Sequence, residues 1–226
     1  MAERAIEMPL KSLPEQIAQW LITEISEERL APGQRITEQF IADRFNVSRG
    51  PVRDAFRMVE KTGLVKLLPR RGVVVTPLDA EELEDLFEIR TALMRCVLRR
   101  VIRKTSDEQV QALLAGAQEL LGIVSEEDRF YAASNALGER FMQLAVSQKL
   151  DEFMEPVQLQ IMRYRHHGFS SAAARKASAE GFRDLALALI KRDETALLDV
   201  LESANARLKA EVLRAFSPRV LTGEEE

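Results

Sequence analysis

The segment from residue 37 to residue 75 constrains the fold most, because it carries the caps and spacing of two short helices joined by a tight turn. Thr37 is a favourable helix N-cap, and Glu38 follows in the first turn, where a carboxylate complements the helix dipole. The apolar residues of this first helix have helical spacing and are Phe40, Ile41 and Phe45. Asn46 tolerates a left-handed backbone, so we expect the chain to turn sharply there.

The second helix of the segment carries arginines on one face. Ser48 is a favourable N-cap, and Pro51 is tolerated in the first turn, where its missing N–H would have no partner. The buried face is predicted to consist of Val52, Ala55, Phe56 and Val59. Arg49 and Arg53 are four residues apart and share another face, which Arg57 extends. A helix that enters the major groove reads bases near its N-terminus, where Ser48, Arg49 and Arg53 lie.

A basic hairpin is predicted after this helix. Gly63 is expected to end the helix, and residues 64–68 and 73–75 have the apolar, β-branched character of strands. The turn between them consists of Pro69, Arg70, Arg71 and Gly72. Such a hairpin directly after a recognition helix is typical of the wing of a winged helix-turn-helix. Gly72 would let the backbone approach a phosphate or the floor of the minor groove.

Positive charge is concentrated on the same segment. Between Arg44 and Arg71 there are eight basic and two acidic residues, a net charge of +6, whereas the whole chain has a formal net charge of −4. The basic residues are Arg44, Arg49, Arg53, Arg57, Lys61, Lys66, Arg70 and Arg71. One arginine-bearing amphipathic helix is usually a solvated face. The combination of cap, turn, helix and basic wing instead predicts binding to a polyanion, double-stranded DNA.

The remainder of the chain, from about residue 79, has the pattern of helices alone. Helix starts are predicted at Asp79, Ser106 and Ser125, and the breaks between segments indicate about six helices. Residues 78–226 carry 20 basic and 26 acidic residues, which disfavours DNA binding by this part. We therefore expect a mainly α protein: a winged helix-turn-helix with a small β-hairpin in residues 1–77, and an all-α six-helix bundle in residues 78–226.

Composition also bears on the compartment. Cys96 is the sole cysteine, so no internal disulfide can form, as is usual in a reducing cytosol. No apolar run has the length that crosses a bilayer, and residues 1–14 lack the apolar core of a signal peptide. We expect a cytoplasmic protein that does not associate with membranes.

The sequence APGQRITEQFIADRFNVSRGPVRDAFRMVEKTGLVKLLPRRGVVV resembles the N-terminal domain of GntR-type bacterial transcription regulators, over about residues 13–77. The resemblance implies that Ser48, Arg49, Gly50 and Arg53 contact the operator, together with Arg71 and Gly72 at the wing tip. The position matching Gln39 is often arginine in that family, and glutamine can still bond a base or a phosphate without bringing charge. The DNA-binding residues expected are Gln39, Ser48, Arg49, Gly50, Arg53, Arg57, Arg71 and Gly72.

The helical part resembles the FCD domain of the FadR subfamily of GntR regulators. Many such domains bind a divalent metal through Asp and His side chains, and the matching positions here are Gly138, Met142, Phe182 and Ala204. None of these side chains can coordinate a metal, so we expect neither a metal nor another cofactor. The only two histidines, His166 and His167, are adjacent and point in different directions on a helix, which makes them poor joint ligands.

A small-molecule effector is implied by the same resemblance. If the cavity is retained, Arg90, Asn135 and Arg140 are candidate anchors for an acidic metabolite, and Met142 and Phe182 would line its wall. Arg90 could equally be a structural hydrogen-bond hub, and Met142 and Phe182 are most simply core residues. Tyr131 and Tyr164 are further wall or core candidates.

We expect a homodimer that presents two winged heads to a roughly two-fold symmetric operator, with operator affinity controlled by the effector. One alternative is an effector-independent DNA-binding dimer. Another is a helical-bundle enzyme that the head localises, although no catalytic residues are identified. The sequence contains no Cys–His or Ser–His–Asp arrangement and no phosphate-binding glycine loop. We therefore expect a regulator and not an enzyme.

Overall fold

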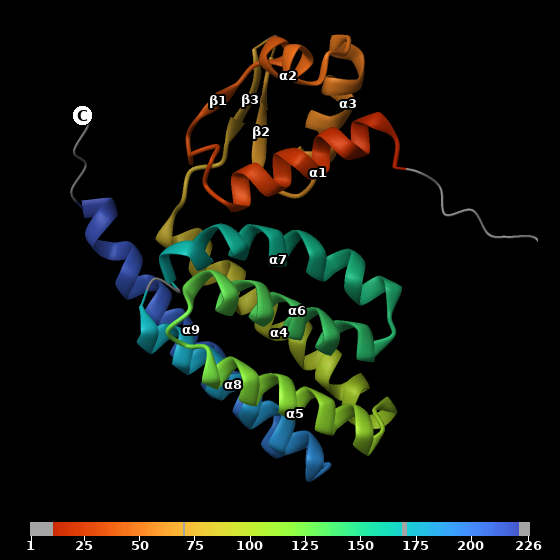
Figure 1. The fold of residues 1–226 in the computed structure, drawn as a ribbon, viewed down its shortest axis with the longest axis vertical. Coiled ribbons are helices and arrows are strands. Elements are labelled where there is room, and N and C mark those ends of the chain that lie inside the picture. Colours follow the sequence, from red (N-terminus) through yellow and green to blue (C-terminus); the bar gives the residue numbers. More distant parts are fainter. Residues whose placement is uncertain (1–10, 70, 169–170, 222–226) are drawn as a thin grey trace, which may run out of the picture. The chain divides into compact units, whose positions relative to one another are not determined.

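The computed structural model describes residues 11–69, 71–168 and 171–221. The chain divides into two compact units, Met1–Pro77 and Leu78–Glu226, which are described separately (Figure 1). The described part is mainly helical, with one small antiparallel sheet in the first unit, so the predicted fold class is confirmed.

The first unit contains three helices and a three-stranded sheet. In chain order they are α1 (Leu13–Ser26), β1 (Arg35–Ile36), α2 (Glu38–Phe45), α3 (Arg49–Glu60), β2 (Val65–Leu68) and β3 (Gly72–Val75). The sheet order is β1-β3-β2, and both pairs are antiparallel. Strand β1 was not predicted, because two residues are too few to show a period. Its register places Arg35 opposite Val74 and Ile36 opposite Val73.

The caps of α2 form as the sequence predicts, whereas the C-terminal end of α3 differs. The Thr37 hydroxyl accepts a hydrogen bond from the Phe40 N–H at 3.2 Å, and Asn46 has the left-handed backbone expected of it, with φ of 52°. The C-cap of α3 is Lys61 and not Gly63, which lies two residues further on with φ of 78°. Ile41 is fully buried, but Phe40 is 50% exposed, so the prediction that Phe40 lies on the apolar face is wrong.

The core of the first unit lies between α1, α3 and the sheet. Its fully buried residues include Ile17, Leu21, Ile36, Val52, Ala55, Val59, Leu64, Val73 and Val75. Trp20 of α1 contacts the edge of Phe45 at a ring separation of 5.4 Å, and this contact joins α1 to α2. Helix α3 is therefore held by its apolar face, and its opposite face is left to solvent.

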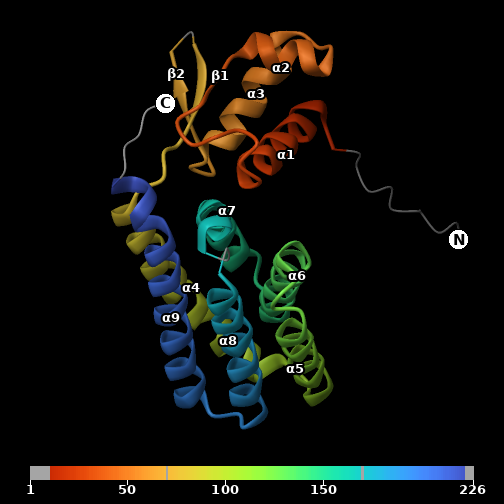
Figure 2. The ribbon, with the colours of Figure 1, turned by 60° about the vertical axis from the view of Figure 1, so that its left-hand side comes forward.

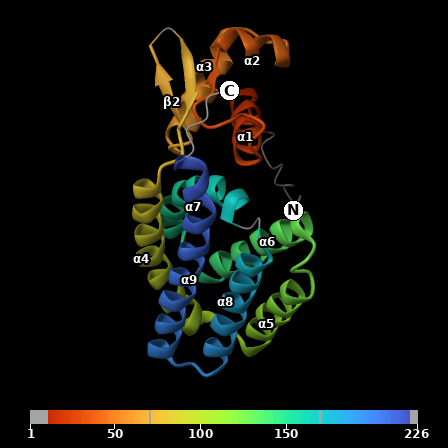
Figure 3. The ribbon, with the colours of Figure 1, turned by 90° about the vertical axis from the view of Figure 1, so that its left-hand side faces the viewer.

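The second unit is a bundle of six described helices, as predicted (Figures 2 and 3). They are α4 (Ala80–Lys104), α5 (Asp107–Gly122), α6 (Glu127–Ala145), α7 (Gln148–Gly168), α8 (Ala172–Ile190) and α9 (Glu194–Leu221). Helix α6 begins later than expected, because its N-cap is Glu126 and not Ser125. In Figure 2, α8 and α9 run side by side, whereas α7 is viewed nearly along its axis and so crosses them.

Two hydrophobic clusters hold the bundle. The larger one joins all six helices, α7 through Met154, and its fully buried residues include Val97, Leu98, Val101, Ala117, Phe130, Leu189 and Leu197. The smaller one attaches α7 to α4 and α9 and consists of Leu83, Leu86, Phe87, Val157, Ile161, Tyr164 and Val212. Among the described helices, none combines the length and the apolar character that a membrane-spanning helix requires.

Helix α6 ends at a strained residue, which gives a testable prediction. Val146 has φ of 48° and ψ of 65°, a left-handed conformation that is costly for a β-branched side chain, and it is 68% exposed. We expect Val146→Gly to raise the free energy of unfolding by about 1 kcal/mol, because the strain is relieved and little burial is lost. Urea titration would measure the change. Val146→Ala is the control and should have a smaller effect, and a lower midpoint for the glycine variant would contradict the prediction.

Candidate nucleic-acid interface

Helix α3 divides its side chains between the core and solvent. Its buried residues are Val52, Ala55, Phe56 and Val59, the four expected from the spacing. Arg49, Arg53 and Arg57 are all exposed and lie on the side away from that core. Three guanidinium groups are thus presented along one helix whose backbone is fixed from behind.

The N-terminus of α3 is open to a ligand. Ser48 is the N-cap, and its side chain makes no capping hydrogen bond. Ser48, Arg49 and Gly50 are exposed, and a Cβ built on Gly50 would have only the Ser48 Oγ, 3.9 Å away, within 4 Å. A helix N-terminus has a partial positive charge and outward-facing N–H groups, and it therefore suits a phosphate.

Arg53 is held by a carboxylate from the neighbouring helix. Its Nε lies 2.8 and 2.9 Å from the two carboxylate oxygens of Glu38, the first residue of α2. The hydrogen bond to Glu38 raises the pKa of the Arg53 guanidinium. Among the described residues, no acceptor engages the two terminal nitrogens of Arg53. These are the donors with which arginine binds the O6 and N7 atoms of guanine.

Arg49 is held in a similar way, by Gln39. Both the Nε and the Nη2 of Arg49 donate to the Gln39 Oε1, the first at 3.0 Å. The Gln39 Nε2 in turn donates to the Asp43 Oδ1 at 2.5 Å. Gln39 was expected as a possible DNA contact without charge. The structure gives it a further role, because it connects Arg49 to Asp43 and fixes the direction of the guanidinium.

The wing contributes Arg71, which is exposed, and Gly72, which is buried. Gly72 has φ of 87°, and a Cβ at this position would lie 2.1 Å from the carbonyl oxygen of Ile36. The structure thus gives this glycine a structural reason, and its expected close approach to a phosphate or the minor groove stays a prediction. Strand β1 occupies the space that a side chain would need. The predicted wing residue Arg70 lies outside the described residues.

For two basic residues, the structure differs from what the sequence indicated. Arg44 was counted in the basic patch, but its guanidinium lies over the Trp20 ring at 4.6 Å and so contacts α1. Arg35 was missed. It is exposed on β1, and its Nε donates to the carbonyl oxygen of Arg71 at 3.1 Å. No periodicity could reveal Arg35, because it reaches the wing only through the pairing of β1 with β3.

A groove joins the recognition helix to the wing. Its lining residues are Glu38, Arg53, Phe56, Arg57, Leu67, Leu68, Pro69 and Gly72. Leu67 is 39% exposed, and its N–H donates to the Glu60 carboxylate at 3.0 Å, which fixes β2 against α3. Arginines and the wing thus border one continuous concave surface, which has the chemistry to receive a phosphate backbone.

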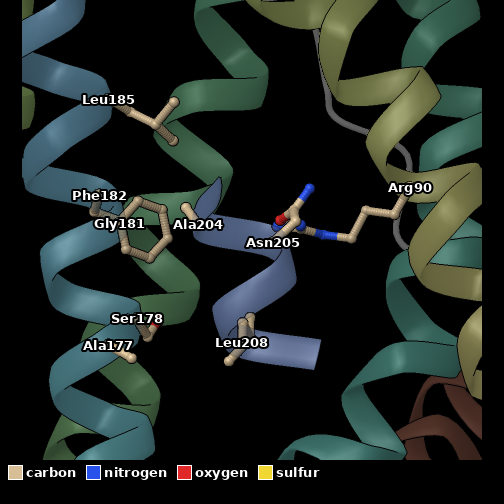
Figure 4. A pocket seen from close by; sticks show the side chains of 9 residues that line it. All are labelled: Arg90, Ala177, Ser178, Gly181, Phe182, Leu185, Ala204, Asn205 and Leu208. Atoms are coloured by element: carbon tan, nitrogen blue, oxygen red, sulfur yellow. The ribbon is translucent and has the colours of Figure 1, made fainter. Parts of the chain in front are cut away.

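The ligand residues predicted in the second unit do not all line one of the described pockets. Arg90 and Phe182 line a small pocket of about 50 Å³ (Figure 4). Met142 lines a different hollow, and Asn135 and Arg140 line neither of the two. Arg90 reaches from α4 to Asn205 of α9, where its Nη1 donates to the Asn205 Oδ1 at 2.6 Å. The structure therefore favours the interpretation of Arg90 as a hydrogen-bond hub.

Apolar groups fill the positions that match the family's metal ligands. A Cβ on Gly138 would lie 3.9 Å from the Phe182 ring, which packs on Phe141 at a ring separation of 5.7 Å. Ala204 lies beside Gly181, where an added Cβ would approach to 3.1 Å (Figure 4). A pocket of about 50 Å³ has room for a water molecule or two. The side chains of His166 and His167 lie outside the described ones.

Comparison with known proteins agrees with this geometry. Residues 13–75 match the model of the bacterial regulatory proteins of the gntR family, and residues 85–211 match that of the FCD domain. The HTH-type transcriptional repressor RspR of Escherichia coli (strain K12) is 27% identical over 191 residues, which cover 84% of this chain and 84% of that protein. The uncharacterized HTH-type transcriptional regulator YdhC of Bacillus subtilis (strain 168) is 38% identical over 82 residues, covering 36% of this chain and 37% of that protein.

Solved structures share the fold. E. coli McbR/YncC has a TM-score of 0.77 at 17% identity and covers 92% of this chain and 100% of that one. A GntR-type regulator from Rhodococcus sp. RHA1 has a TM-score of 0.72 at 22% identity and covers 91% of this chain and 99% of that one.

Proposed function

The chain belongs to the GntR family of bacterial transcription regulators and carries an FCD domain, and on this premise we propose that it binds its operator as a homodimer under the control of a small molecule. Regulators of this kind bind DNA through the first domain and effectors through the second, and they are not enzymes. Family membership does not specify the residues that read DNA, the dimer or the effector of this chain.

The exposed arginine face of α3 is the observation that carries the proposal. Arg49 and Arg53 project from the N-terminal half of a helix that is fixed by its buried face, and each is held by a side chain of α2. Pre-oriented arginine forks are suited to guanine in the major groove. Ser48, Gly50, Arg57, Arg71 and the Gly72 backbone would then contact phosphates and set the register.

Two physical arguments support the homodimer and the effector control: the symmetry of the operator and the thermodynamic linkage between effector binding and DNA binding. Two heads of one kind are best matched by a two-fold symmetric site, which a C2 dimer provides. An effector that binds one arrangement of the heads more tightly than another changes operator affinity by the ratio of its two affinities. A protein that acts on chromosomal DNA in a bacterium works in the cytoplasm, where we place it.

Selection of bound genomic fragments, followed by fluorescence anisotropy, tests the proposal. We expect recovery of a duplex with two related half-sites, bound with an affinity that falls as salt rises, by a slope of about −0.9 for each phosphate contacted. Failure of the purified protein to bind any duplex at low salt, with and without added metabolites, would overturn it.

An effector-independent DNA-binding dimer is the second candidate. One observation favours it, because the pocket at Arg90 and Phe182 has only about 50 Å³ and its arginine is bonded to Asn205. Thermal unfolding with candidate metabolites separates the two. An effector that binds the native state raises the unfolding midpoint, whereas an effector-independent regulator shows no shift with any of them.

Glu38 should contribute specificity at the expense of affinity. In Glu38→Ala, Arg53 loses the carboxylate that orients it, and each head loses a negative charge near the phosphates. We expect binding to random duplex to rise, and the ratio of specific to non-specific affinity to fall roughly 5- to 10-fold. Anisotropy with the selected duplex and a scrambled one measures both.

Asp54→Ala is the matched control for this prediction. The substitution also removes one negative charge from each head, this time from α3. The Asp54 carboxylate, however, pairs with Arg57, at 3.5 Å, and not with Arg53. Random-duplex binding should rise in this variant too, with the ratio preserved. An unchanged ratio in Glu38→Ala would show that Arg53 does not depend on Glu38 for its direction.

A further inference from the structure

A second hollow of the second unit lies between α6 and α7 and is larger than the pocket at Arg90. Its volume is about 340 Å³, against about 50 Å³ for that pocket. The lining residues are Glu139, Met142 and Gln143 of α6, and Asp151, Met154, Glu155, Gln158, Leu159 and Met162 of α7. A volume of this size is within the range of small-molecule sites.

The packing of the bundle explains why the hollow exists. Helix α6 packs on α4 and α5, whereas α7 packs on α4 and α9. Val157, Ile161 and Tyr164 anchor α7 in the cluster with α4 and α9, and Met154 anchors it in the larger cluster. Helices α6 and α7 make few direct backbone contacts with each other, and residues of both helices line the groove that is left between them.

The chemistry of the walls is both apolar and acidic. Met142, Leu159 and Met162 are partly exposed and supply adaptable apolar surface, whereas Met154 is only 2% exposed and belongs to the larger hydrophobic cluster. Glu139, Asp151 and Glu155 are exposed at the rim, and no basic residue lines the hollow among the described residues. Lys149, near the start of α7, pairs with Glu152, which is not a lining residue.

We propose that this hollow is the effector site and that its ligand is a small organic cation with an apolar body, such as an amine or a quaternary ammonium. The inference rests on the proposed function, because it names the effector class of the same domain. Three carboxylates and no cation would repel the acidic metabolite expected from the family resemblance. They would attract a cation whose hydrocarbon part packs on Met142, Leu159 and Met162.

Helix α7 also provides a connection to the segment that follows the DNA-binding unit. The Tyr164 hydroxyl accepts from the Asp79 N–H at 3.1 Å and lies 2.9 Å from the Glu82 carboxylate. The Arg163 guanidinium, in a side chain that is almost fully buried, lies 3.5 Å from the same carboxylate. Asp79 is the N-cap of α4 and follows Pro77, the last residue of the first unit, by two positions. A ligand that displaces α7 therefore acts on the first turn of α4.

The test uses the full-length protein with benzyltrimethylammonium as the probe and phenylacetate as the matched acid, at equal ionic strength. Titration calorimetry should give a dissociation constant on the order of 1 mM for the cation and no binding of the acid. The cation should also change affinity for the selected duplex. Asp151→Asn/Glu155→Gln should weaken cation binding at least tenfold, as expected when two of three charges are lost.

Glu152→Gln is the control, because it removes a charge from the same turn of α7 outside the hollow, and it should bind the cation as the parent does. Binding of phenylacetate in place of the cation, absence of cation binding, or equal cation binding by the double variant would each overturn the inference. Operator binding without ligand is measured in the same experiment. If the parent protein does not bind the operator, the result counts against the proposed function. If it binds the operator but the cation does not change that affinity, the result counts against the effector site alone.

Discussion

Gly72→Ala is expected to lower the free energy of unfolding of the first unit by about 2–3 kcal/mol. The φ of 87° at this position is costly for any residue with a Cβ. In addition, the new Cβ would lie 2.1 Å from the Ile36 carbonyl oxygen and 3.0 Å from the Thr37 Cα. Both are backbone atoms, so no side-chain rotation relieves the clash. Strand β1 would have to separate from β3, and β3 would then keep only β2 as a neighbouring strand.

Trp20 is the only tryptophan and lies in the first unit, so its fluorescence during urea unfolding measures this effect directly. Gly33→Ala is the matched control, because Gly33 has φ of 78° and nothing within 4 Å of the added Cβ. It should cost only the conformational penalty, about 1 kcal/mol. Equal stabilities of the two variants would show that β1 yields easily and that Gly72 is not required for the sheet.

The sequence predicts the recognition helix well because its determinants are local. The Ser48 cap, Pro51 in the first turn and the four buried positions all lie within twelve residues, and the structure places each as expected. The exposed faces of Arg49 and Arg53 follow from the same 3.6-residue period. The six helices of the second unit were predicted for a similar reason, because capping residues and breaks mark their ends.

What the sequence could not predict depends on contacts between distant segments. The pairing of β1 with β3, which explains Gly72, joins residues almost 40 positions apart and leaves no pattern in either strand. Phe40 has helical spacing, yet only the placement of α2 on the core decides that Ile41 is buried and Phe40 is not. The bonds of Glu38 to Arg53 and of Gln39 to Arg49 likewise require the relative position of α2 and α3.

The same limit applies to the proposed effector site. Arg90 was an anchor candidate because of its charge, but its bond to Asn205 spans 115 positions and could not be foreseen. The hollow between α6 and α7 arises from the way both helices pack on α4, a tertiary property. Among the residues that line this hollow, only Met142 was predicted to bind a ligand. That prediction came from its match to a metal-ligand position of the FCD domain and not from the chemistry of its side chain. Cavities are therefore the least predictable part of such a chain.

Arg49→Ala is expected to reduce affinity for the selected operator by about 10- to 100-fold, which corresponds to roughly 1–3 kcal/mol. The side chain is exposed, so urea unfolding should be unchanged within about 0.5 kcal/mol. Because Gln39 orients the guanidinium, we expect Gln39→Ala to show a smaller loss of the same kind.

The discriminating comparison is with Arg57→Ala, which lies further along the exposed face of α3 and contacts Asp54. If Arg57 binds phosphate, its removal weakens selected and scrambled duplexes alike and reduces the magnitude of the salt slope by about 1 for each head, or about 2 for the dimer. If Arg49 reads a base, its removal weakens binding to the selected duplex far more than to the scrambled one. Substitution of the base that Arg49 contacts, at one position of each half-site, should then cause no further loss of affinity in the Arg49 variant. An Arg49 variant that loses affinity equally for both duplexes would assign this side chain to the phosphate backbone and leave Arg53 as the base-reading arginine of α3.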